Sequence, residues 1–233
     1  MSRVVDGRTF ILGDGREVRL AGIEVPPLPA SPESGAVPGG AAARDALAAF
    51  VANTEIMLKR AEAASDRYGR TLAYAIAVRG GVEHSAQAEL IAAGFARVAA
   101  RVGNRNCALE LLARESVARG GKLGLWADSY YGLLDADNPA DVLAERGRFA
   151  LVEGKVVSVR ESGATIYVNF GRRWTEDFTV TILKRSERTF TAAGLEPKRL
   201  AGRRVRVRGW IEERGGPWIE AAHPEQIELT DRE

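Results

Sequence analysis

The chain has 233 residues, with 33 lysines and arginines against 31 aspartates and glutamates. This length is enough for one large domain or two ordinary domains, each with its own core. One cysteine and two histidines exclude an internal disulfide and a cysteine-rich zinc site, and no apolar stretch approaches the roughly 20 residues of a membrane helix. The formal net charge of +2 gives little support to a polyanionic partner, so such a case must rest on local clusters of cations.

Strand-like runs alternate with helical patterns in the first half of the chain. Residues 3–12 and 17–23 read as strands joined by the turn Gly13-Asp14-Gly15. Residues 26–40, rich in Pro, Gly, Ala and Ser, have no periodicity and read as a loop. The remaining predicted elements are a helix over 41–51, a strand over 55–60, a turn over 66–70, a strand over 72–78, and helices over 84–93 and 106–120.

A composition break over 129–147 separates this half from the rest and predicts a linker between two domains, 1–128 and 148–233. In the second domain the apolar residues recur with a period of two. This pattern predicts strands over 150–159, 164–170, 177–183, 203–212 and 218–222, with a helix around 187–200. Five strands with a helix after the third is the order of an oligonucleotide-binding (OB) barrel.

Three separated segments of the first domain carry a shared pattern: Val4-Val5-Asp6-Gly7-Arg8-Thr9-Phe10, then Val18-Arg19-Leu20-Ala21-Gly22-Ile23-Glu24-Val25-Pro26-Pro27, then Asp66-Arg67-Tyr68-Gly69-Arg70-Thr71-Leu72-Ala73-Tyr74. Together they resemble the staphylococcal (thermonuclease-like) nuclease family, whose usual sequence motifs are close to VxDGDT, RLxGIDxPE and DRYGRxLA. The resemblance implies an OB-type barrel with three helices. With the second five-stranded barrel, the predicted fold class is α+β and β-rich.

The chain departs from those family motifs at three positions. Arg8 stands where the resemblance implies a metal-binding aspartate, and Glu24 stands for a second aspartate ligand. Pro27 stands for the glutamate that activates water. The family's two catalytic arginines are matched by Arg19 and Arg70, and an aromatic of its nucleotide pocket is matched by Tyr68.

These departures matter because cleavage of a phosphodiester needs a base, a cation and donors that clamp the phosphate. An arginine in place of an aspartate reverses the local charge, so Arg8 is expected to repel calcium. Pro27 has neither a titratable group nor a backbone donor and cannot act as a base. Glu24 and the loop residue Glu33 remain as acid/base candidates. We therefore predict that the chain binds no metal and no cofactor; calcium is expected only if the site is active. The predicted phosphate-binding residues are Arg8, Arg19, Arg70 and Tyr68.

A structural interpretation of the same residues stays open. Arg8 could pair with Glu24 or Asp6 and fill the emptied metal position, which would leave a salt-bridge cluster that binds nothing. Asp6 is a weak metal candidate, because the following Gly7 indicates a role in capping a turn.

The second domain has a basic stripe in which Val205 and Val207 alternate with cations. Such a stripe interleaved with aromatic side chains suits a single strand of nucleic acid, by backbone attraction and base stacking. Alternating arginines are also commonly a solvated face paired with glutamates, and Glu212, Glu213 and Glu220 are available. A structural or domain-docking role therefore stays open. The predicted binding face consists of Arg204, Arg206, Arg208, Trp210, Tyr167 and Trp174.

Three functions follow. The favoured one is a pseudoenzyme of the nuclease family that binds single-stranded nucleic acid or another phosphate-rich ligand with little or no cleavage. The second is an active phosphodiesterase with a rewired site, in which Arg19 and Arg70 clamp the phosphate. The third is a scaffold that uses both barrels for protein contacts. The oligomeric state does not follow from the sequence.

The N-terminus, Met1-Ser2-Arg3, leads straight into an apolar run and has none of the segments of an export signal. A cytoplasmic protein and an exported protein with its signal removed both fit. Since many bacterial members of the nuclease family are exported, the second is the favoured expectation.

Overall fold

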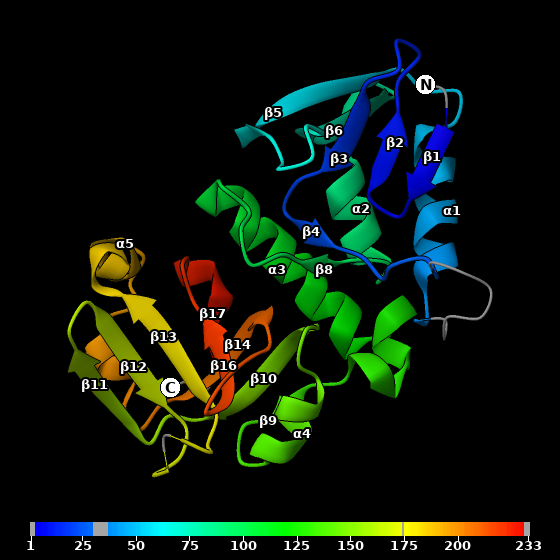
Figure 1. Cartoon of the computed structure of the whole chain (residues 1–233). Helices are drawn as coiled ribbons and strands as arrows, with labels where there is room; N and C mark the ends of the chain where they lie inside the picture. Colours follow the sequence, from blue (N-terminus) through cyan, green and yellow to red (C-terminus); the bar gives the residue numbers. More distant parts are fainter. Residues whose placement is uncertain (1–2, 30–36, 174, 231–233) are drawn as a thin grey trace. The chain divides into compact units, whose positions relative to one another are not determined.

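The computed structural model describes residues 3–29, 37–173 and 175–230, and the chain divides into two compact units, 1–131 and 132–233 (Figure 1). Both units combine helices with sheets, so the predicted α+β, strand-rich class is confirmed. The described strands form open sheets, and none closes into a barrel through its hydrogen bonds, unlike the two barrels predicted. Within the described ranges, no helix has the length and apolarity needed to span a membrane.

The first unit is built on a sheet of order β1-β2-β3-β6-β5, with β7 beside β6, and on a small sheet that pairs β4 with β8. Three α-helices and two 3-10 turns accompany them. The bounds are β1 (Arg3–Asp6), β2 (Thr9–Ile11), β3 (Glu17–Leu20), β4 (Ile23–Glu24), α1 (Gly40–Val51), β5 (Ile56–Ser65), β6 (Thr71–Arg79), β7 (Val82–Ser85), α2 (Ala86–Ala92), β8 (Arg97–Val98), α3 (Arg105–Gly120), η1 (Gly124–Ala127) and η2 (Ser129–Tyr131).

The run 3–12, predicted as one strand, is a hairpin of β1 and β2 that turns at Gly7. The Asp6 carboxylate accepts a hydrogen bond of 2.8 Å from the Arg8 backbone N–H, which is the turn cap expected of Asp6. Gly7 is required by space, since a Cβ there would lie 2.6 Å from the Cβ of Ala43 in α1. This turn brings Arg8 to the side of β3.

The first core lies between the sheet and the helices, and includes Phe10, Leu20, Leu47 and Ile91. Successive side chains of a strand point to opposite faces. In β3, Val18 and Leu20 are buried in this core, so Arg19 between them points to the opposite face of the sheet. The core thereby positions Arg19.

Tyr74 of β6 gives the first unit a measurable pH dependence. Its hydroxyl donates to the Val102 carbonyl, and burial, followed by the nearby Cys107 and Glu62, raises the pKa of Tyr74 from 10.0 to about 12. The folded state holds this proton more tightly than the unfolded state does, so this contribution to stability is complete below pH 10 and is lost as the pH rises through about 12.

We therefore expect urea denaturation to show a free energy of unfolding that falls between pH 10 and 12. The Tyr74→Phe variant should be less stable at neutral pH and should show a shallower fall over that range. An equal slope in both proteins would contradict the assignment of the shift to Tyr74.

The second unit has two sheets, of order β17-β14-β10-β9 and β11-β12-β13-β16-β15. Residues 132–147, most of the predicted linker, carry β9 and α4. The bounds are β9 (Leu134–Asp135), α4 (Pro139–Ala144), β10 (Phe149–Lys155), β11 (Ser158–Ser162), β12 (Thr165–Asn169), β13 (Thr179–Leu183), η3 (Lys184–Ser186), α5 (Glu187–Ala192), η4 (Pro197–Leu200), β14 (Arg204–Trp210), β15 (Glu212–Arg214), β16 (Gly216–Glu220), η5 (Pro224–Gln226) and β17 (Ile227–Leu229).

Two predicted elements of this unit are each divided in the structure. The predicted strand 150–159 is β10 and β11, which belong to different sheets. The predicted helix 187–200 is α5 followed by η4, because Gly194 takes a left-handed φ of 78° and Pro197 then starts a new turn. The core of the unit includes Ile166, Val180 and Val207 from the two sheets.

Candidate phosphate-binding site

Arg19 is the central cation of the site that the sequence predicts. It lies on β3, opposite Thr9 of β2 and Leu72 of β6. Its side chain is half-buried, and no other described residue forms a hydrogen bond or an ion pair with it. Arg19 is therefore a cation without a direct partner in the described part of the chain.

Arg8, by contrast, has an ion-pair partner and a hydrogen-bond partner. Its guanidinium lies 2.5 Å from the Glu24 carboxylate, and it also donates a hydrogen bond of 3.0 Å to the Ile23 carbonyl. The exposed fractions of the two charged side chains are only 15% and 17%. This is one of the two pairings that the structural interpretation allowed, and it balances the charge of the carboxylate that stands where the resemblance implies a metal ligand.

Arg70 is held by the turn that precedes β6. Its Nε and Nη2 both lie 2.7 Å from Oδ2 of Asp66, and its Nη1 lies 3.9 Å from Glu17. Tyr68, in the same turn, is 67% exposed and has its ring centre 5.1 Å from the Arg70 guanidinium carbon. The turn thus presents an exposed aromatic ring beside a cation whose charge is largely balanced.

The three arginines lie close enough to affect one another. Burial, and then the charges of Arg8 and Arg70, lower the pKa of Arg19, while Glu24 and Asp6 act in the opposite direction. Glu24 is itself paired with Arg8, and the combined effect of these groups still lowers the pKa of Arg19. An anion beside Arg19 would relieve this unfavourable electrostatic environment.

The comparisons with known proteins concern this same part of the chain. Residues 17–128 match the family model described as staphylococcal nuclease homologue. These residues form a staphylococcal nuclease homologue domain. No curated protein matches the chain. The matched range lies inside the first unit and contains Arg19, Glu24 and Arg70, while Arg8 precedes it.

The carboxylates that lie near Arg19 have other roles. Asp6 caps the β1–β2 turn and Glu24 pairs with Arg8. Across the described ranges, no group of three or more His, Cys, Asp or Glu side chains is arranged to hold a metal ion. Pro27, where the resemblance implies a water-activating glutamate, is exposed. Glu33, the other acid/base candidate, lies outside the described residues.

The basic stripe of the second unit is paired with acids. Both Arg204 and Arg206 contact Glu153 of β10, at 3.2 and 2.8 Å. Glu228 of β17 lies 3.8 Å from Arg206 and 2.6 Å from Arg208, which is completely buried. Arg206 lies opposite both glutamates in the strand register. The pairing expected of a structural face is therefore present, but with these two glutamates and not with Glu212, Glu213 or Glu220.

The two described aromatic members of that predicted face belong to different sheets, Trp210 to that of β14 and Tyr167 to that of β12. Trp210 is 48% exposed and packs edge-to-face on Phe149, with ring centres 6.0 Å apart. Tyr167 belongs to β12, in the other sheet, and Trp174 lies outside the described residues. Glu153 and Glu228 were missed at the level of the sequence. The available signal was one acid within the apolar run of β10 and one between Ile227 and Leu229.

Proposed function

We propose that the nuclease homologue domain binds the phosphodiester of a nucleic acid at Arg19 and does not cleave it efficiently. The observation that carries this proposal is the half-buried Arg19, which lies near Arg8 and Arg70 and has no ion pair within the described chain. A guanidinium offers a planar set of donors that matches two oxygens of a phosphate. A bound phosphate would supply both the missing hydrogen bonds and the missing negative charge.

Weak or absent cleavage follows from the same contacts. Cleavage would need a cation to balance the developing charge and a base to take a proton from water. Glu24 is a candidate either for holding a metal cation or for acting as the base, but it is paired with Arg8 at 2.5 Å. Proline at position 27 offers no proton acceptor. Binding without turnover is the function that these residues support best.

Arg19→Gln tests the proposal. Titration of the full chain with a 5′-phosphorylated dinucleotide should show affinity about 10- to 100-fold below that of the natural sequence, since a hydrogen bond to a charged group contributes about 1.5–3 kcal/mol. The free energy of unfolding should stay equal or rise slightly, because the variant removes a cation from a partly buried, like-charged environment.

Arg16→Gln is the matched control. Arg16 is exposed in the β2–β3 turn and pairs with Asp14 at 2.7 Å, so its loss should change neither property appreciably. A clearly destabilised Arg19→Gln variant with unchanged dinucleotide affinity would show that Arg19 is structural and would refute the proposal.

A further inference from the structure

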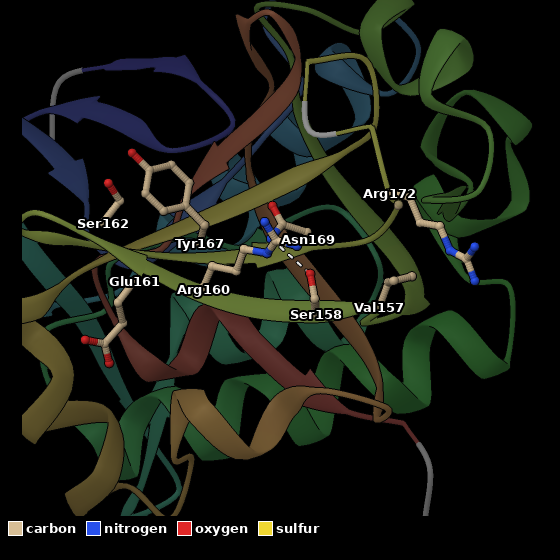
Figure 2. Close-up of a pocket in the computed structure, with 9 residues that line it drawn as sticks. Val157, Ser158, Arg160, Glu161, Ser162, Tyr167, Asn169 and Arg172 are labelled. Carbon is tan, nitrogen blue, oxygen red and sulfur yellow. Dashed lines mark hydrogen bonds between the residues drawn. The ribbon is translucent and has the colours of Figure 1, made fainter.

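The outer face of the five-stranded sheet in the second unit is hollowed. A cavity of about 790 Å³ lies over β11 and β12, and its lining includes Ser158, Arg160, Tyr167, Asn169 and Arg172 (Figure 2). A second cavity of about 240 Å³ shares Tyr167 and Asn169 with the first and extends over β13 and β16 to Arg214 and Trp218. Because they share these two residues, the cavities are adjacent, and together they are named here the sheet groove.

The strand register places two rows of side chains in the sheet groove. One row runs from Arg160 through Tyr167 and Thr181 to Glu220. The other runs from Ser158 through Asn169 and Thr179 to Trp218. Directly opposed residues of neighbouring strands share a face of the sheet. The buried apolar residues that alternate with these rows, Ile166 and Val168 among them, belong to the core on the other face.

The floor of the sheet groove is polar and ordered. Asn169 is only 5% exposed, donates to the Ser158 hydroxyl at 3.3 Å and accepts from the Thr179 hydroxyl at 3.4 Å. An amide has two N–H donors and two acceptor lone pairs, so one of each remains for a ligand. A fixed side chain with a spare donor and a spare acceptor suits the edge of a planar, hydrogen-bonding group.

The arginines of the sheet groove differ from those of β14. Arg160 and Arg172 are exposed, and neither has a hydrogen bond or ion pair with another described residue. Glu161 also lines the cavity, but it pairs with Lys184 at 2.6 Å and Lys198 at 2.9 Å. Figure 2 shows Glu161 pointing away from Tyr167. Its charge is therefore balanced by two lysines, and Arg160, which lies opposite Tyr167 in the strand register, remains available to an anion.

We propose that the sheet groove is a binding site for single-stranded nucleic acid. The Tyr167 ring stacks on an unpaired base, Asn169 hydrogen-bonds to a base edge, and Arg160 and Arg172 contact backbone phosphates. A duplex is disfavoured because its bases are already stacked and paired, which leaves none free for Tyr167. This site lies in a different unit from Arg19 and does not rest on the proposed function of the nuclease homologue domain.

The test measures binding of a labelled single-stranded oligonucleotide of about 12 nucleotides to the full chain carrying Arg19→Gln, so that the first unit contributes little. In that background, Tyr167→Leu should weaken binding about 5- to 100-fold, because stacking contributes that range per base. Tyr167→Phe keeps the ring and should retain most of the affinity. Arg160→Ala should lower the slope of log affinity against log salt concentration by about 0.7.

The matched controls lie in the same unit but outside the sheet groove. Arg188→Ala removes an exposed arginine, and Trp210→Leu removes the exposed aromatic of the β14 face. Both should bind as the parent does, and thermal denaturation should show that all variants are folded.

Equal binding by the Tyr167→Leu variant, loss of binding in Trp210→Leu alone, or equal affinity for duplex would each overturn the inference. Absence of any binding in the Arg19→Gln background, with binding in the natural sequence, would also overturn it while leaving the proposed function of the first unit intact.

Discussion

A chain carrying Arg8→Asp and Glu24→Asp is expected to bind calcium and to be stabilised by it, whereas the natural sequence is not. The double substitution removes the guanidinium that lies 2.5 Å from Glu24 and leaves carboxylates in its place. Without metal, these like charges repel one another; with calcium, they become oxygen ligands. Urea denaturation should show a free energy of unfolding higher by about 2.7 kcal/mol when calcium is present at 100 times its dissociation constant.

Arg8→Ala with Glu24→Asp is the control, because it removes the cation without supplying a ligand at that position. Its stability should respond to calcium much less. If the natural sequence gains as much stability from calcium as the Arg8→Asp double variant, then Arg8 does not exclude the ion, and the argument against a metal at this site fails. Adding Pro27→Glu to the double variant should then raise calcium-dependent cleavage above that of the natural sequence, since it restores a proton acceptor.

Arg208→Ala is expected to cost about 3–5 kcal/mol of the free energy of unfolding, the range measured when one member of a buried ion pair is removed. Arg208 is fully buried and lies 2.6 Å from Glu228, so among the described residues its loss leaves that carboxylate with the more distant Arg206 at 3.8 Å. Urea denaturation followed by circular dichroism measures the loss.

Arg204→Ala provides the comparison on the same strand. The Arg204 side chain is 52% exposed and contacts Glu153, so its removal should change stability by only about 1 kcal/mol or less. The paired substitution of Arg208→Leu with Glu228→Leu should recover much of the stability lost in Arg208→Ala, because it also removes the carboxylate that Arg208→Ala leaves without its 2.6 Å partner. Equal losses in Arg204→Ala and Arg208→Ala would contradict the view that β14 carries a buried structural pair.

Local sequence patterns predicted helices and strands well where the secondary structure depends on residues of the same segment. The helix predicted over 41–51 is found as α1 (Gly40–Val51), and the one over 106–120 as α3 (Arg105–Gly120). The run 3–12 was misread as a single strand because its turn depends on the close approach of α1 to Gly7, which is a tertiary contact.

The charges of the sites could be predicted only in part, because their partners come from other strands. Alternation in β14 predicted that its arginines would share a face, yet Glu153 and Glu228 lie 53 and 22 residues away from Arg206 and meet it only through the sheet register. The pairing of Arg8 with Glu24 was foreseen as one of two interpretations. The sheet groove was not foreseen, because it needs the relative order of β11, β12, β13 and β16.

The central claim is binding of nucleic acid without efficient cleavage. Its most direct test incubates the full chain with single-stranded and duplex DNA and RNA, with and without calcium, and measures retention and strand length in the same samples. We expect the protein to retain single strands, and this retention should weaken as the salt concentration rises. The length of the strands should be unchanged whether or not calcium is present. Shortened strands that require calcium, and that disappear in the Arg70→Ala variant, would contradict the claim and identify an active nuclease.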